Sequence, residues 1–284
     1  IEYKLDYHEA YNNWGNALSD LAETKSGGEA EALYKEAIKK YQKAIEYKLD
    51  YHEAYNNWGN ALIYLAQTKS GSEAEKLYDE AIEKYQKAIE YKLDYPEAYN
   101  NWGVALSDLA ETKSGGEAEA LYKEAIKKYQ KAIEYKLDYH EAYNNWGNAL
   151  IYLAQTKSGS EAEKLYDEAI EKYQKAIEYK LDYPEAYNNW GVALSDLAET
   201  KSGSDAERLY NEAIEKYQQA IKYGGRSYNL ACLYVLRNRK EEALKYLDHA
   251  LSRGEVLVEF VENGWIGMRD DSDFKHLLSQ YKGK

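Results

Sequence analysis

The sequence predicts an all-α solenoid, a stack of antiparallel helix hairpins, from three observations. Tryptophans recur at an unbroken period of 44 residues, at Trp14, Trp58, Trp102, Trp146 and Trp190. Apolar side chains recur within each period at helical spacing, and helix-stopping glycines fall at the same place in every period. Because one hairpin cannot bury both of its apolar faces alone, successive hairpins are expected to stack, each contacting only its neighbours.

The repeats come in two types. They run over residues 3–46, 47–90, 91–134, 135–178 and 179–222. Residues 47–90 and 135–178 are identical, which gives a second period of 88 residues and an A-B-A-B-A order. The first and third repeats differ only where Pro96 and Val104 replace His8 and Asn16. Recent duplication and deliberate assembly both explain such an array.

Each repeat begins with one amphipathic helix. Asp6 and Glu9 have the spacing of a capping box, which predicts a helix start. One apolar stripe follows at helical spacing, over Tyr7, Tyr11, Trp14, Leu18 and Leu21. Trp14 stands at the centre of the stripe beside Gly15, so we expect it and its equivalents to be buried.

A second helix completes each hairpin. The first helix should stop near Gly27, because glycine adopts the left-handed conformation that ends helices. Ser26 and Glu29 form a second potential capping box. Both helices are expected to span about 18–20 residues, or about 30 Å at 1.5 Å per residue. The second stripe contains Ala30, Leu33, Tyr34, Ala37, Tyr41, Ala44 and Ile45.

These residues resemble the tetratricopeptide family. Its pattern W-x2-L-G-x2-Y…A-x3-F…P is similar to Tyr11-x2-Trp14-Gly15-x2-Leu18…Ala37-x3-Tyr41, with Leu49 where the family usually has proline. The long repeats resemble the 34-residue motif with about ten residues inserted at the hairpin tip. The resemblance implies a right-handed superhelix of about six hairpins whose concave face is lined by the first helices.

The sequence divides into three regions. Residues 1–222 are expected to form the five 44-residue hairpins, and residues 223–254 one hairpin of normal family length. Residues 255–284 are expected to form C-terminal capping helices, the last of them starting near Ser272.

Charge and composition argue against several classes of partner. The net charge is −13, whereas nucleic acids and anionic membranes bind clusters of Lys and Arg. The sequence has no signal peptide and no apolar run long enough to span a bilayer. Cys232 is the single cysteine, so no internal disulfide can form. We therefore expect a cytoplasmic protein, without nucleic-acid or membrane partners.

The sequence does not suggest an enzyme. His8, His52 and His140 occupy equivalent helix starts, and two sister repeats carry proline there, which a catalytic or ligating role would not tolerate. His249 and His276 lack metal-ligand spacing, and Cys232 lies in an apolar helix that suits a buried thiol. We expect no catalytic residue, no metal and no cofactor.

The concave face is the candidate binding surface. By the resemblance, asparagines on the first helices form a ladder that can grip a peptide backbone, since each amide both donates and accepts. Tying neighbouring repeats together is an equally good explanation for some of them. The candidate peptide-binding residues are Glu9, Asn12, Asn16, Asn56, Asn60, Asn100, Asn144, Asn148 and Asn188. No Lys or Arg stands where the family's carboxylate clamps need them.

Two functions remain open. The first is a non-catalytic scaffold for protein or peptide partners, with basic or amide-rich segments preferred over acidic ones. The alternative is an engineered or recently amplified structural array with no cognate ligand. Residues 1–6 match residues 45–50, as though the chain were cut from a longer array. An apolar N-terminal end is therefore expected, which could associate with a second copy.

Overall fold

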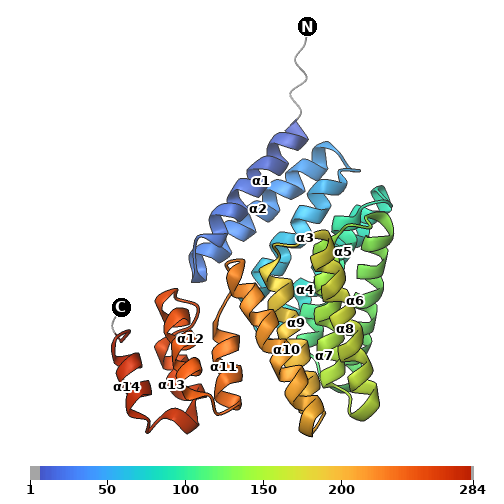
Figure 1. Ribbon diagram of the computed structural model, residues 1–284. Helices are drawn as coiled ribbons and strands as arrows, with labels where there is room; N and C mark the ends of the chain where they lie inside the picture. Colours follow the sequence, from blue (N-terminus) through green and yellow to red (C-terminus); the bar gives the residue numbers. More distant parts are fainter. Residues whose placement is uncertain (1–6, 283–284) are drawn as a thin grey trace. The chain divides into compact units, whose positions relative to one another are not determined.

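The computed structural model describes residues 7–282, and these residues form helices without any strand (Figure 1). The chain divides into an N-terminal unit, Ile1–Thr156, and a C-terminal unit, Lys157–Lys284. The N-terminal unit contains α1 (Tyr7–Glu23), α2 (Gly27–Tyr47), α3 (His52–Gln67), α4 (Gly71–Tyr91), α5 (Pro96–Glu111), α6 (Gly115–Tyr135) and α7 (His140–Gln155). The C-terminal unit contains α8 (Gly159–Tyr179), α9 (Pro184–Glu199), α10 (Gly203–Lys222), α11 (Tyr228–Leu236), α12 (Lys240–Ser252), α13 (Val258–Gly264), η1 (Ile266–Met268) and α14 (Ser272–Ser279).

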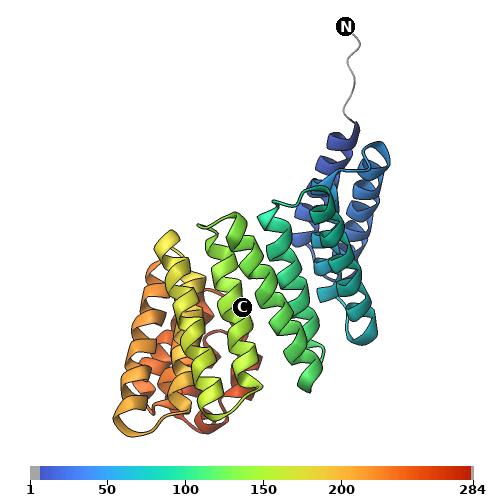
Figure 2. The same ribbon diagram turned by 90° about the vertical axis from the view of Figure 1, so that its right-hand side faces the viewer.

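The predicted antiparallel hairpins are present. In the N-terminal unit α1 pairs with α2, α3 with α4 and α5 with α6, and each hairpin packs against the next (Figure 2). In the C-terminal unit α9 pairs with α10 and α11 with α12. No described helix is long and apolar enough to cross a membrane.

The helix boundaries differ from the prediction in two ways. In the 44-residue repeats the first helices have 16 or 17 residues and the second helices 20 or 21, rather than 18–20 in each. As predicted, Gly27 is left-handed, with φ of +59°, but it already belongs to the second helix.

One of the two predicted capping boxes begins at Asp6 and so lies outside the described residues. At the equivalent place α3 begins at His52, whose N–H bonds to the backbone oxygen of Asp50 at 2.9 Å. The turn therefore supplies a backbone acceptor where a side-chain cap was expected. Ser26 makes no capping bond either; it lies at an exposed tip, where water can reach the first N–H groups of α2.

A glycine–tyrosine contact holds the two helices of each hairpin close together. A Cβ atom added to Gly103 of α5 would lie 2.5 Å from the ring of Tyr129 on α6, and one added to Gly59 would lie 2.6 Å from Tyr85. Tyr85 and Tyr129 are each only 1% exposed. The core around the Tyr85 ring contains alanine, leucine and isoleucine side chains, among them Leu62, Ala66 and Ala81, together with a second buried tyrosine, Tyr78.

The prediction that the repeated tryptophans are buried was wrong. Trp14 is 53% exposed, and its four equivalents are half-buried. The neighbouring glycine occupies the position nearest the second helix. The indoles of Trp58 and Trp102 pack against the core on one face and leave the other face uncovered by it. A lysine covers that other face: the Lys84 ammonium lies 4.5 Å from the Trp58 ring centroid, and that of Lys216 4.0 Å from Trp190.

The apolar side chains of α1 are more exposed than their counterparts in later repeats. Leu21 is 46% exposed, whereas the equivalent Leu65 is 4% exposed because it packs against the preceding hairpin. Residues 1–6 lie outside the described part of the chain. Association of a second copy through this face remains a prediction.

Replacing Gly103 by alanine should lower the free energy of unfolding by about 1–3 kcal/mol, because the new methyl group collides with the buried Tyr129 ring. The matched control is Gly116→Ala near the start of α6, where an added Cβ meets nothing within 4 Å. This control should be neutral or slightly stabilising. Urea unfolding followed by circular dichroism measures both. Equal stabilities of the two variants would contradict the role of the close contact.

Candidate functional site

Asparagine side chains tie each first helix to the next one in the N-terminal unit. Asn101 of α5 donates through Nδ2 to Oδ1 of Asn56, at 3.1 Å, and to Oδ1 of Asn60, at 3.0 Å, both on α3. Asn57 of α3 makes the same pair of bonds to Asn12 and Asn16 of α1, each at 3.1 Å. These bonds fix the register between neighbouring hairpins.

The predicted site residues therefore separate into different environments. Asn12, Asn56, Asn100 and Asn144 are only 5–6% exposed and cannot present an amide to a partner without disrupting the packing. Asn16 and Asn60 are half-buried and line a shared hollow. Asn148 and Asn188 are also half-buried, and Asn188 accepts a 3.0 Å bond from Asn229 in the C-terminal unit. Glu9 is exposed and does not line the hollows described below.

Sequence reasoning missed the bridging residues Asn57, Asn101 and Asn145, the second members of the repeated Asn-Asn pairs. Asn145 of α7 donates to Asn100 of α5 at 3.1 Å. The doubled asparagine was the available signal, because adjacent residues point in different directions around a helix. One amide of the pair can therefore be buried while the other reaches the preceding hairpin.

Buried tyrosine hydroxyls complete the network. Tyr85 donates to Oδ1 of Asn60 at 2.8 Å, and Tyr41 donates to Oδ1 of Asn16 at 3.0 Å. Both asparagine oxygens thus accept two hydrogen bonds, one from tyrosine and one from the next repeat. Among the described residues, none accepts a hydrogen bond from Nδ2 of Asn16 or Asn60. These two N–H groups are therefore available to an acceptor on a partner.

The first of two neighbouring hollows is polar. This polar hollow lies between α1 and α3 over Tyr41 and has a volume of about 310 Å³. Asp20 and Glu23 give it negative charge, and none of the residues that line it is basic. Its lining residues are Asn16, Ser19, Asp20, Glu23, Tyr41, Asn57, Asn60, Ala61 and Tyr64.

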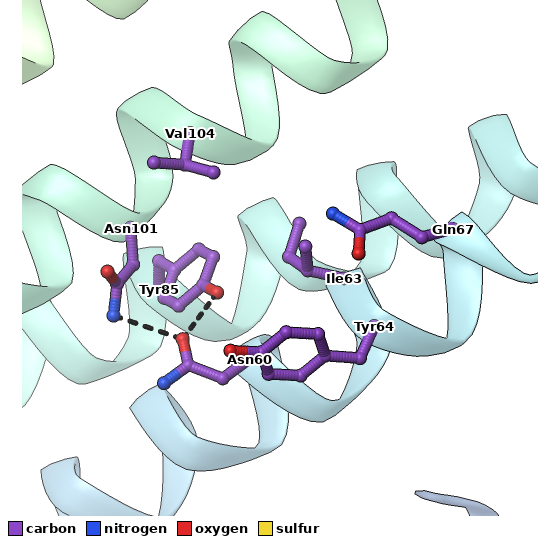
Figure 3. A pocket seen from close by; sticks show the side chains of 7 residues that line it. All are labelled: Asn60, Ile63, Tyr64, Gln67, Tyr85, Asn101 and Val104. Atoms are coloured by element: carbon purple, nitrogen blue, oxygen red, sulfur yellow. Dashed lines mark hydrogen bonds between the residues drawn. The ribbon is translucent and has the colours of Figure 1, made fainter. Parts of the chain in front are cut away.

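The second hollow, called the apolar hollow because no charged residue lines it and Ile63 and Val104 do, lies between α3 and α5 over Tyr85, with a volume of about 260 Å³. Amide side chains make up much of the rest of its lining. Figure 3 shows the Asn60 amide oxygen held by Tyr85 and Asn101 while its nitrogen points away from both. Beside them lie Ile63 and Val104; the lining is completed by Tyr64 and Gln67. The two hollows share Asn60 and Tyr64, so they adjoin on α3, and together they are called the groove.

Acidic side chains recur farther along this groove. Gln67 donates to Asp108 of α5 at 3.2 Å. Burial raises the pKa of Asp108 to about 6; the bond from Gln67 acts in the opposite direction, and nearby Glu111 adds to the rise. Burial is the main cause of a raised pKa in the tyrosines around Asp108, and the Asp108 carboxylate adds to the rise. These are Tyr78 and Tyr85 on α4, Tyr122 and Tyr129 on α6, and Tyr152 on α7.

A Ser-His-Glu cluster in the C-terminal unit lacks the geometry of a catalytic triad. Ser227 Oγ lies 2.9 Å from Nδ1 of His249 and 3.1 Å from Glu255 Oε2, so the carboxylate bonds to the serine rather than to the histidine. Ser227 is fully buried, and Glu255 also accepts its backbone N–H. The cluster instead joins the start of α11 to the end of α12. No group of three or more potential metal ligands was found within residues 7–282.

Comparison with protein families explains this arrangement. Residues 76–109 and 164–197 match a family model described as TPR repeat, and residues 228–260 match one described as Tetratricopeptide repeat. The chain contains tetratricopeptide repeats. The first match covers most of α4 and all but the end of α5, and it leaves out the hairpin tips on both sides.

Solved structures share the tetratricopeptide fold. The structure from a functional characterization of pilF of Pseudomonas aeruginosa is 15% identical, has a TM-score of 0.61, and the match covers 96% of this chain and 97% of that one. TTC0263, a thermophilic TPR protein in Thermus thermophilus, is 15% identical with a TM-score of 0.51, over 76% and 97% of the two chains.

YrrB, described as a TPR protein with an unusual peptide-binding site, is 22% identical with a TM-score of 0.48, over 78% and 94% of the chains. At these identities the likeness shows the fold alone. A comparison with curated protein sequences gives no match.

Replacing Asn101 by alanine should cost about 1–3 kcal/mol of unfolding free energy, because it leaves the buried Asn56 oxygen without its donor. The matched control is Asn13→Ala, at the equivalent position of α1, where the side chain is exposed. Denaturant unfolding of both variants measures the difference. A cost for Asn13→Ala as large as that for Asn101→Ala would show that the bridge contributes nothing.

Replacing Asp108 by asparagine should raise the free energy of unfolding at pH 7 by about 1–3 kcal/mol. In the folded protein the pKa of Asp108 is about 6, above its ordinary value of 3.8. The Asp108 carboxyl therefore holds its proton more tightly in the folded than in the unfolded protein. Stability of the parent protein therefore falls as the pH rises from about 4 to about 6, and the variant lacks this loss. Denaturant unfolding of the parent protein and of Asp108→Asn at pH 4 and pH 7 measures this difference in free energy, with the exposed Asp20→Asn as control. A gain of the same size at both pH values would contradict the assignment.

Proposed function

We propose that this protein is a non-catalytic scaffold that binds an extended protein or peptide segment along the groove of α1, α3 and α5. The observation that carries this proposal is the pair of joined hollows floored by Tyr41 and Tyr85. Over each floor an asparagine keeps its oxygen occupied and its Nδ2 group unused. An extended backbone presents carbonyl acceptors that suit such donors.

Charge defines the kind of segment that fits. Asp20 and Glu23 line the polar hollow, and Asp108 and Glu111 stand at the equivalent positions of α5. Burial, followed by the charges of Glu23 and Asp20, raises the pKa of Tyr64 between them. A negative surface without Lys or Arg in either hollow attracts cationic side chains and repels carboxylates. Basic or amide-rich segments are therefore the preferred partners.

Titration with equal-length Lys-rich and Asp-rich peptides at low salt tests this function. The Lys-rich peptide should bind more tightly, and the preference should shrink as salt is added. Replacing Asn16 and Asn60 by valine, which the chain itself carries at Val104 and Val192, should weaken binding about tenfold by removing the donors.

The control is Gln86→Ala, on the exposed side of α4 outside the groove. It should bind like the parent protein. Tighter binding of the Asp-rich peptide, or unchanged binding after the two valine substitutions, would refute the proposed site.

The identity of residues 47–90 and 135–178 favours a second candidate function, an engineered or recently amplified structural array with no cognate ligand. A groove selected for one ligand would be expected to differ from repeat to repeat. The same titration separates the two candidates, because the structural array should bind neither peptide even at low salt.

A further inference from the structure

The groove of the N-terminal unit alternates in chemistry with the A-B order of its repeats. A-type repeats place Ser19-Asp20 and Ser107-Asp108 on the groove side of the first helix. At the equivalent place the B-type repeat has Ile63-Tyr64. Since each hollow forms between two successive first helices, its character depends on which type of repeat comes first.

The three successive junctions follow that rule. Between α1 and α3 the hollow is lined by Asp20 and Glu23. Between α3 and α5 the hollow is lined by Ile63 and Val104 together with uncharged amides; no carboxylate lines it, although Asp108 is bonded to Gln67 at its rim. Between α5 and α7 the acidic pair Asp108 and Glu111 stands where Asp20 and Glu23 stand in α1, and Tyr152 stacks on Tyr122 as Tyr64 stacks on Tyr34. The order along the array is thus acidic, apolar without a lining charge, acidic.

The spacing of the junctions sets the spacing of the side chains that can enter them. Neighbouring helices pack with their axes about 8–10 Å apart, and an extended chain advances about 3.3 Å per residue. A segment that crosses the first helices therefore advances about three residues from one junction to the next. Residue 1 of the segment then lies at the acidic junction between α1 and α3. Residue 4 lies at the apolar hollow between α3 and α5, and residue 7 at the acidic junction between α5 and α7.

We propose that this groove selects extended segments with basic side chains at positions 1 and 7 and an apolar side chain at position 4. This selectivity rests on the proposed scaffold function and adds a sequence pattern to it. The pattern reads the same in both chain directions, so it does not depend on which way the segment lies. Main-chain carbonyls between these positions accept from Asn16 and Asn60, and the central apolar side chain packs against Ile63 and Val104.

Two peptides of identical composition test the pattern by fluorescence anisotropy at low salt. One has Lys, Leu and Lys at positions 1, 4 and 7 with neutral spacers; the other has Lys, Lys and Leu at the same positions. The first should bind about tenfold more tightly to the parent protein, because the second places a charge in the apolar hollow and leucine beside Asp108.

A reciprocal variant separates pattern from net charge. Ile63→Ser combined with Tyr64→Asp copies the A-type residues into α3, a sequence that the same fold already tolerates in α1 and α5. All three junctions are then acidic, so the preference between the two peptides should fall to within about twofold. Lys127→Gln on the exposed side of α6 changes the net charge equally and should keep the tenfold preference.

The outcomes are distinct. Equal binding of both peptides to the parent protein, or a preference that survives in the double variant, overturns the pattern while the scaffold function stands. Binding of neither peptide, when the Lys-rich peptide also fails to bind, overturns both.

Discussion

The close approach of a glycine on the first helix to a buried tyrosine on the second is the contact on which the rest of each hairpin depends. The added-Cβ distances of 2.5–2.7 Å at Gly59, Gly103 and Gly191 leave no room for a larger residue. This contact brings the tyrosine hydroxyl through the hairpin to the groove side. It also leaves the neighbouring tryptophan only half-buried, packed against the core on one face and covered by a lysine on the other, as at Trp58 and Lys84.

The tyrosine hydroxyl also takes part in the hydrogen bonds that join one hairpin to the next. The hydroxyl of Tyr85 occupies one lone pair of the Asn60 oxygen, and Asn101 of the following repeat occupies the other. Ion pairs at the hairpin tips reinforce the register, as between Lys113 and Glu75 at 2.9 Å and between Lys201 and Glu163 at 2.5 Å. Packing within a hairpin, register between hairpins and the chemistry of the groove are thus coupled. Where Val104 replaces the accepting asparagine, Tyr129 retains the contact with Ser107, at 3.3 Å. Tyr41 makes the equivalent contact with Ser19, at 3.2 Å, in addition to its bond to Asn16.

Much of the fold follows from the sequence alone, because the repeat period, the apolar stripes and the left-handed tip glycines are local signals. The buried state of Tyr34 and Tyr41 follows from the same stripes. The exposure of Trp14 could not be predicted, because periodicity identifies the inward side of a helix but not which residue lies nearest its partner. The bridging role of Asn57 depends on which of two adjacent amides meets the preceding hairpin. The hollows involve side chains from two repeats, so neither repeat alone predicts them.

Some asparagine amides hold neighbouring hairpins together, and others leave an N–H group for a partner. A crystal structure of the protein with a Lys-x-x-Leu-x-x-Lys peptide bound tests this claim most directly. We expect a peptide carbonyl within hydrogen-bond distance of Asn60 Nδ2, while Asn101 still donates to Asn56 and Asn60 as in the free protein. We also expect the leucine beside Ile63 and Val104. A peptide bound outside the groove, or one for which Asn101 turns away from α3, would contradict this division of the amides.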